Sequence, residues 1–231
     1  MVQKLSFHGV VEVFSGAPRM AAMSSPETPQ TPTPPVAPSV RLAMPAEALQ
    51  ISEIQRRAWA RDDLQRRMLD EVDLDQMAEV WHRAITRPPL AHFRVLVAVQ
   101  AFGAAEPGTE PGSTRQRTAV CGFAAVGPSD DPDADPTDSM VAEFCVDPLL
   151  AGQGHEDRLM HAAVNTMQAD GYLRATWWLL STDDQMRSWL TEAGWAPDGA
   201  HREVGTPDGV LRVKQIRMHT DISPSTGSGN E

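Results

Sequence analysis

A pair of glycines lies where an anion could bind. Gly152 and Gly154 stand between an apolar, strand-like run at 140–146 and a segment with helical periodicity. The first N–H groups of a helix have no partner within the helix and its dipole favours negative charge, while glycine lets the backbone approach a diphosphate closely. The spacing therefore indicates a phosphate loop, although two such glycines can equally make a tight strand-to-helix turn.

A cluster of aspartates precedes the same run. The segment 129–138 is acidic enough to suggest a calcium loop, but Pro136 stands where an EF-hand needs glycine and no glutamate closes the loop. We expect a solvated hairpin loop, whose charge could also attract a cationic substrate. Its acidic members are Asp130, Asp131, Asp133, Asp135 and Asp138.

The overall composition excludes several classes of protein. The 231 residues include 20 basic and 31 acidic side chains, a net charge of -11, whereas a nucleic-acid partner normally requires a basic face. Cys121 and Cys145 lie in apolar runs and make neither a disulfide framework nor a metal cluster, which indicates a reducing cytoplasm. No apolar run approaches the length of a membrane span. We predict a cytoplasmic protein with no metal and no membrane or nucleic-acid partner.

Composition also divides the chain. The Pro/Thr/Ser-rich stretch at 24–38 cannot bury enough apolar surface to fold, so residues 1–38 are predicted to be a disordered N-terminal extension. Residues 223–231 are predicted to be a flexible tail. The folded domain is then 39–222.

Apolar periodicity inside this domain predicts an alternation of strands and helices. Helices are expected at 51–59, at 74–85 after an interruption by Asp62-Asp63, between the glycine pair and a cap at Gly171, and at 183–193. Strands are expected at 40–44, 93–99, 120–126, 140–146, 175–180, 201–204 and 210–218. This order predicts an α/β (α+β) domain in three layers around a mixed sheet.

Three motifs occur along this framework. Phe144-Cys145-Val146-Asp147-Pro148 ends a strand, Gly152-Gln153-Gly154 forms the glycine loop, and Glu192-Ala193-Gly194-Trp195 ends a helix. With the element order over 40–222, they resemble the GNAT superfamily of N-acetyltransferases, in particular a bacterial, actinobacterial-like member. The resemblance implies a mixed, mostly antiparallel central sheet flanked by helices on both faces.

The resemblance also implies acetyl-CoA as cosubstrate. Family members bind its thioester arm along the strand that corresponds to 140–146, which splays from the strand at 175–180, and its pyrophosphate on the glycine loop. The cofactor-binding residues carried over to this sequence are Phe144, Cys145, Val146, Gly152, Gln153, Gly154, His155, Arg158 and Asp183, the last in place of a family asparagine.

The loop departs from the family pattern, Arg/Gln-x-x-Gly-x-Gly/Ala. Ala151 replaces the first residue, and Glu156 replaces the small residue beside the phosphates. Glu156 would repel a diphosphate, although His155 and Arg158 could offset part of the repulsion. Leu190 takes the position of the tyrosine that serves as general acid in many family members. The pyrophosphate loop is therefore altered, and no general acid carries over.

Acetylation of an amine also needs a base, or a chain of water molecules, to remove the ammonium proton. Glu143 is the candidate because its strand should line the cleft, although alternation could send its side chain to the other face and a bulge would change the outcome. His201, in the first of the two closing strands expected at 201–204 and 210–218, is a second candidate. Cys145 is expected to pack in the core rather than to act as a nucleophile. Trp59 and Trp81 are expected in the core, with one of them able to shape the acceptor pocket.

Two functions remain open. One is an acetyl-CoA-dependent N-acetyltransferase that transfers an acetyl group to a primary amine, on a small molecule or a peptide, by direct attack. The alternative is a catalytically degenerate GNAT module that acts as a binding or regulatory domain, which Ala151, Glu156 and Leu190 favour. The closing strands could also mediate a homodimer.

Overall fold

The computed structural model describes residues 38–70, 72–103, 116–206 and 209–224. The predicted extension 1–38 and tail 223–231 therefore lie outside the described residues, apart from residues 38, 223 and 224. The strands are β1 (Ser39–Leu42), β2 (Arg94–Gly103), β3 (Gln116–Pro128), β4 (Asp138–Val146), β5 (Arg174–Leu180), β6 (Ala196–Gly205) and β7 (Arg212–Asp221). The helices are α1 (Ala48–Trp59), α2 (Asp63–Leu69), α3 (Leu74–Thr86), α4 (His155–Ala169) and α5 (Asp184–Glu192), with a 3-10 turn η1 (Pro45–Glu47) before α1.

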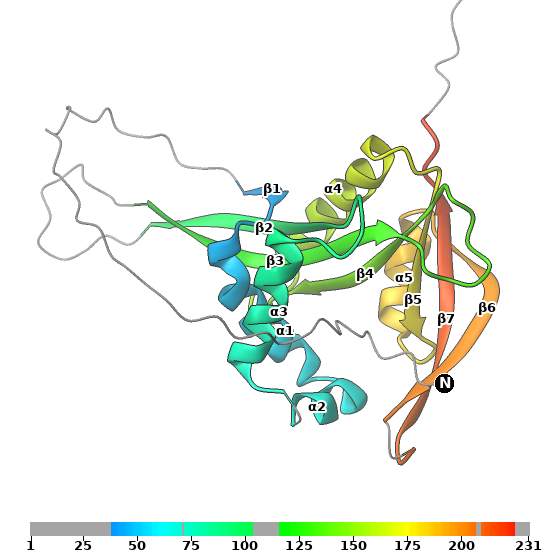
Figure 1. Ribbon diagram of the computed structural model, residues 1–231, viewed down its shortest axis with the longest axis horizontal. Helices are drawn as coiled ribbons and strands as arrows, with labels where there is room; N and C mark the ends of the chain where they lie inside the picture. The colour runs from blue at the N-terminus through cyan, green and yellow to red at the C-terminus, as the bar shows by residue number, and fades with distance from the viewer. Residues whose placement is uncertain (1–37, 71, 104–115, 207–208, 225–231) are drawn as a thin grey trace, which may run out of the picture.

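One mixed sheet runs through the described molecule in the order β1-β2-β3-β4-β5-β7-β6. Neighbouring strands are antiparallel except β4 and β5, which are parallel. Helices α1 and α3 pack on one face of the sheet, and α4 and α5 on the other (Figure 1). The prediction of a mostly antiparallel sheet between two helical layers is confirmed. None of the described helices is long and apolar enough to cross a bilayer.

Alternation along the central strands supplies an apolar core on each face. In β2, Val95 and Val97 face α1 and α3, whereas Leu96 and Ala98 face α4. Helix residues complete the two cores: Ile51 and Ile54 of α1 with Trp81 of α3 on one face, and Leu159, Ala163 and Met167, at intervals of four along α4, on the other. The sheet is therefore buried on both faces at its centre, which fixes the strands around the candidate site.

Helix α2 was not predicted. It begins directly after Asp62, a residue whose charge suggests an interruption in the sequence. The carboxylate of Asp62 instead accepts a hydrogen bond from the backbone N–H of Gln65 at 2.9 Å, as a capping residue does. The other predicted helices and strands are present, and β6 begins at Ala196 rather than at 201.

Strands β4 and β5 separate along their length. Their ladder joins only Asp138–Val141 to Arg174–Trp177. β4 continues beside β3 as far as Val146, and β5 continues beside β7 as far as Leu180. In the described part of the chain no strand lies between these two extensions, so the sheet contains a gap that widens towards the carboxyl end of β4.

Candidate active site

A cavity of about 1430 Å³ occupies the gap between β4 and β5. Its walls include 142–146 and 177–180 from the splayed strands, Ala151 and Glu156 near the glycine loop, and residues of α1 to α3. Typical small-molecule sites have volumes of about 300–1,000 Å³. This cavity can therefore hold an extended cofactor arm together with a second, small substrate.

A bulge in β4 decides the direction of Glu143. Val141 and Glu143 pair with successive residues of β3, so Ala142 is the extra residue of the bulge. Without the bulge, alternation would place Glu143 on the same face as Val141, which packs in the α4 core. With it, Glu143 turns to the opposite face and reaches side chains of α1.

Three donors surround the Glu143 carboxylate. It accepts hydrogen bonds from Gln55 Nε2 and Trp59 Nε1, each at 3.4 Å, and from Cys145 Sγ at 3.3 Å. Gln55 is itself fixed, because its Oε1 accepts a hydrogen bond from Trp81 Nε1 at 2.7 Å. Burial raises the pKa of Glu143 above its ordinary value, and the hydrogen bonds offset only part of this effect. A carboxylate with a raised pKa at a cavity wall is suited to general-base catalysis.

The remaining predicted residues of β4 also border the cavity. Cys145 is buried, and burial with the adjacent Glu143 charge raises the pKa of its thiol well above the ordinary value. Because a cysteine attacks as a thiolate, this environment does not make it a nucleophile. Phe144 and Val146 point to the other face of β4 and pack against the α4–α5 core.

The glycine loop has a backbone suited to an anion. Gly152 and Gly154 have φ angles of 75° and 73°, in the left-handed region that glycine adopts without strain. Gly154 is the N-cap of α4 and no side chain caps this helix end. A Cβ added at Gly152 would meet nothing within 4 Å, so a ligand can approach the loop there.

The protein itself occupies one donor of this loop. The backbone N–H of Gly152 donates a hydrogen bond to Glu156 Oε1 at 3.3 Å. The Gly152 N–H therefore already has a partner within the protein. Asp157 differs, because its Oδ1 accepts a hydrogen bond from Trp189 Nε1 of α5 at 2.9 Å.

His155 does not bring positive charge to the loop. Its side chain is fully buried, and its Nδ1 lies 3.0 Å from Arg158 Nη2. Because an arginine can only donate, Nδ1 must accept, which places the proton of the neutral ring on Nε2. Burial and the charge of Arg158 lower the pKa of His155. The expectation that His155 offsets the charge of Glu156 is therefore wrong, and Arg158, which also donates to the Gln153 carbonyl at 3.2 Å, is the cation held against the loop.

No tyrosine borders the described cavity wall. Leu190 is completely buried, so this position contributes packing and no acid. Tyr172, the only tyrosine in the sequence, is buried in the α4 core. Asp183 borders the cavity and caps α5, where its Oδ1 accepts a hydrogen bond from the Met186 N–H at 3.0 Å. The described residues also contain no group of side chains that could hold a metal ion.

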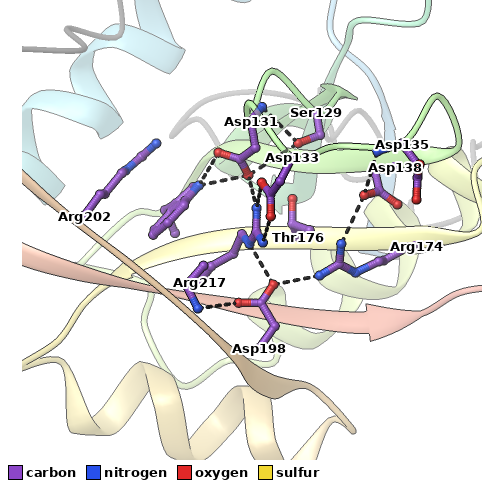
Figure 2. Close-up of polar contacts among 12 residues, drawn as sticks. Ser129, Asp131, Asp133, Asp135, Asp138, Arg174, Thr176, Asp198, Arg202 and Arg217 are labelled. Atoms are coloured by element: carbon purple, nitrogen blue, oxygen red, sulfur yellow. Dashed lines mark hydrogen bonds and ion pairs between the residues drawn. The ribbon is translucent and has the colours of Figure 1, made fainter. Parts of the chain in front are cut away.

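The aspartate-rich loop is fixed by a buried arginine. Arg217 of β7 pairs with Asp131 at 3.0 Å, Asp133 at 2.6 Å and Asp198 at 2.7 Å (Figure 2). Hydrogen bonds to these carboxylates raise the pKa of Arg217 and outweigh its burial. The loop before β4 is thereby joined to β6 and β7.

This network changes the interpretation of the acidic loop. Besides the two aspartates that pair with Arg217, Asp138 pairs with Arg174 at 3.0 Å. Arg217 lowers the pKa of Asp133 to about 2. The expectation of a solvated loop is wrong for Asp131 and Asp138, whose side chains are buried beside arginines, whereas Asp133 pairs with Arg217 and stays exposed. Asp130 is the exposed aspartate of the loop that borders the cavity.

The closing strands present Arg202 rather than His201 to the cavity. Arg202 pairs across the ladder with Gln215, and both residues border the cavity. His201 is exposed and precedes Arg202 in the strand, so it points to the opposite face. The second candidate base is therefore wrong for this site.

The predicted site residues fall into two groups. Glu143, Phe144, Cys145, Val146 and Asp183 border the cavity, while Gly152, Gln153, Gly154, His155 and Arg158 belong to the adjacent loop and the first turn of α4. The partners of Glu143 and the place of Arg202 at the cavity were not predicted from the sequence. The available signal for the partners was the spacing of Gln55 and Trp59, which lie four residues apart on one face of a predicted helix.

No protein-family profile and no curated protein matches this chain. Solved structures do match it. The yncA protein of Salmonella typhimurium, determined with its cofactor acetyl-CoA, is 18% identical, with a TM-score of 0.56 over 82% of this chain and 96% of its own. Ribosomal-protein-alanine N-acetyltransferase of Brucella melitensis is 17% identical, with a TM-score of 0.56 over 79% and 98%. An acetyltransferase of the GNAT family from Streptococcus pneumoniae is 13% identical, with a TM-score of 0.55 over 81% and 100%. At these identities the likeness concerns the fold.

Proposed function

Because this chain has the fold of the GNAT N-acetyltransferases, we propose that it is an acetyl-CoA-dependent N-acetyltransferase acting on a primary amine. The observation that carries this proposal is Glu143, a carboxylate with a raised pKa that borders the gap between β4 and β5. A base of this kind beside a cavity for two substrates would accelerate direct acetyl transfer. The acceptor would be a small molecule or a peptide, and the setting the cytoplasm.

The described residues fit most of acetyl-CoA. Its thioester arm would pass through the gap, along the edge of 142–146 that does not pair with β5. Its pyrophosphate would lie at Gly152 and Gly154 and the first turn of α4, where Arg158 supplies positive charge. Glu156 would have to release the Gly152 N–H so that a phosphate oxygen can take its place.

The chemistry needs one base and a good leaving group. The Glu143 carboxylate would remove a proton from the ammonium group of the acceptor, directly or through one water. The free amine then attacks the carbonyl carbon of the thioester, so that a C–N bond forms and the C–S bond breaks. A second proton, lost from the attacking nitrogen, ends on the CoA thiolate. Because a thiolate leaves readily, the buried Leu190 in place of an acid slows this step without forbidding it.

The second candidate, a degenerate GNAT module with a binding or regulatory role, is favoured by the loop. Ala151 offers no cationic or amide contact to the phosphates, and Glu156 places a carboxylate on a loop donor. Under this alternative the cavity would persist, but acetyl-CoA would bind weakly or not at all.

Calorimetric titration with acetyl-CoA, followed by thiol release in the presence of a panel of primary amines, tests the proposal. We expect saturable micromolar binding and transfer. Glu143→Gln should retain cofactor binding and lower kcat/KM by about 100-fold or more, the usual contribution of a general base. Glu203→Gln, at an exposed carboxylate of β6 outside the cavity wall, is the matched control and should change neither quantity.

Two results would contradict the proposal. Absence of binding at millimolar acetyl-CoA would favour the degenerate module. Normal transfer by the Glu143→Gln protein would show that another group removes the proton.

A further inference from the structure

Arg202 differs from Arg174 and Arg217, the two arginines that bind the aspartate-rich loop. Arg174 and Arg217 each pair with two or more aspartates. The bonded partner of Arg202 is a neutral amide, because its Nε donates to Gln215 Oε1 at 2.8 Å. Over the ranges that the structure describes, no carboxylate lies within ion-pair distance of Arg202, which stands apart from the bonded network in Figure 2. Its charge therefore lacks a direct counter-ion.

The guanidinium of Arg202 is nevertheless held in place. It stacks over the ring of Trp178, with 4.2 Å between Cζ and the ring centroid. Trp178 is in turn fixed, because its Nε1 donates to both carboxylate oxygens of Asp131 at 2.9 and 3.2 Å. The stacking engages one face of the Arg202 guanidinium, and the hydrogen bond to Gln215 engages its Nε. The Nη1 and Nη2 atoms are left for a ligand.

Arg202 also borders the same cavity as Glu143. Desolvation is the largest effect on its pKa and lowers it, while the charges of Asp130 and Asp131 act in the opposite direction without balancing it. Asp131 is already bonded to Arg217 and Trp178. A partly desolvated, rigid guanidinium with two donors on one edge has the geometry for bidentate binding of a carboxylate.

We propose that Arg202 binds a carboxylate of the acceptor, so that the substrate class is a primary amine that also carries a carboxylate, such as a free amino acid. This inference rests on the proposed acetyl transfer, in which the same acceptor presents its amine to Glu143. Arg202 would orient the acceptor and select it over amines without an acidic group, while it takes no part in the chemical step.

The test compares acetylation of the standard L-amino acids with acetylation of the α-amides of the same amino acids, by thiol release from acetyl-CoA. We expect kcat/KM to favour the acid over its amide in the preferred pair. Arg202→Gln should lower kcat/KM for the acid by about tenfold to a hundredfold, the range for a charged hydrogen bond, and leave the amide within about threefold. Arg202→Lys, which keeps the charge but loses the fork and the stacking, should recover only part of the loss.

Arg212→Gln is the matched control, because Arg212 is an exposed arginine of the neighbouring strand that does not border the cavity. Each variant is first checked for unchanged acetyl-CoA binding, so that a folding defect is recognised. Equal loss for acid and amide in Arg202→Gln, or transfer to amides as efficient as to acids in the wild type, would overturn the inference while the proposed acetyl transfer stands. Transfer to neither series, nor to any other primary amine, would overturn both.

Discussion

Replacing Glu156 by glutamine should strengthen the binding of CoA. The Glu156 carboxylate accepts the Gly152 N–H at 3.3 Å, and a phosphate oxygen bound to the same N–H would lie about 3 Å from that nitrogen. The two negative charges would then be within about 6 Å of each other unless the side chain moves away. Glutamine keeps the size and the acceptor oxygen of the side chain and removes only the charge.

The expected gain follows from Coulomb's law. Two unit charges 6 Å apart repel by about 2.8 kcal/mol at an effective dielectric constant of about 20 and by about 0.7 kcal/mol at that of water, about 80. These limits correspond to about a hundredfold and about threefold in the dissociation constant. We therefore expect roughly tenfold tighter binding by the Glu156→Gln protein. Glu156→Ala, which also frees the Gly152 N–H, should bind at least as tightly.

Titration calorimetry with CoA at two ionic strengths is the assay. Asp157→Asn is the matched control, since Asp157 lies in the same helical turn but is bonded to Trp189 of α5. It should change affinity by less than about threefold, the limit calculated for unscreened charges in water. The gain from Glu156→Gln should shrink as salt increases, because the screening length falls to about 10 Å at 0.1 M. A gain no larger than that of Asp157→Asn, or weaker binding, would refute the idea that Glu156 competes with phosphate.

Three further outcomes are expected. Folding raises the pKa of Glu143, so the ionised form costs stability above that pKa; Glu143→Gln should therefore raise Tm by a few degrees at pH 8, with a smaller gain as the pH falls through the raised value. Gly154→Ala, at a φ of 73°, should cost about 1–2 kcal/mol and weaken CoA binding, whereas Gly199→Ala, at a φ of 88° outside the loop, should cost a similar amount and leave binding unchanged. Arg217→Gln should destabilise the fold by about 3–5 kcal/mol, because the buried charge of Asp131 would lose its cationic partner and Asp198 would retain only Arg174. In the wild type, the contribution of Asp133 to the free energy of unfolding should be present above pH 4 and be lost as the pH falls towards 2, because its pKa is lowered to about 2. Thermal unfolding of the Arg217→Gln protein, measured over the same pH range, should not show this loss.

The fold was predictable because its signals are local. Apolar residues at helical spacing in 74–85 and continuous apolar runs at 93–99 and 120–126 specified elements that the structure contains. The glycine pair also marked a true strand-to-helix turn, since both glycines have positive φ. The signal failed for α2, where Asp62 looks like an interruption in sequence and acts as a cap in space.

The site was only partly predictable because its contacts are distant in sequence. The direction of Glu143 depends on one extra residue, Ala142, and period-two alternation does not reveal a bulge. Its partners on α1 are 84 and 88 residues away. A similar separation in sequence made the partners of Arg217 unpredictable, because Asp131 and Asp133 precede it by 86 and 84 residues. Their pairing with Arg217 fixes part of an apparently free acidic loop against β7.

The short ladder between β4 and β5 is a weak connection between the two halves of the sheet. The ladder that joins the half made of strands β1–β4 to the half made of strands β5–β7 has only four residue pairs. It lies at the end where Arg174 also binds Asp138. Beyond the ladder, towards the carboxyl ends of β4 and β5, the cavity lies between the two strands. Strain on the two halves should therefore separate them first at Val141 and Trp177, where the ladder ends beside the cavity, and last at the Arg174–Asp138 ion pair. Hydrogen exchange would then report a graded opening from the open end, which a ligand spanning both halves would suppress.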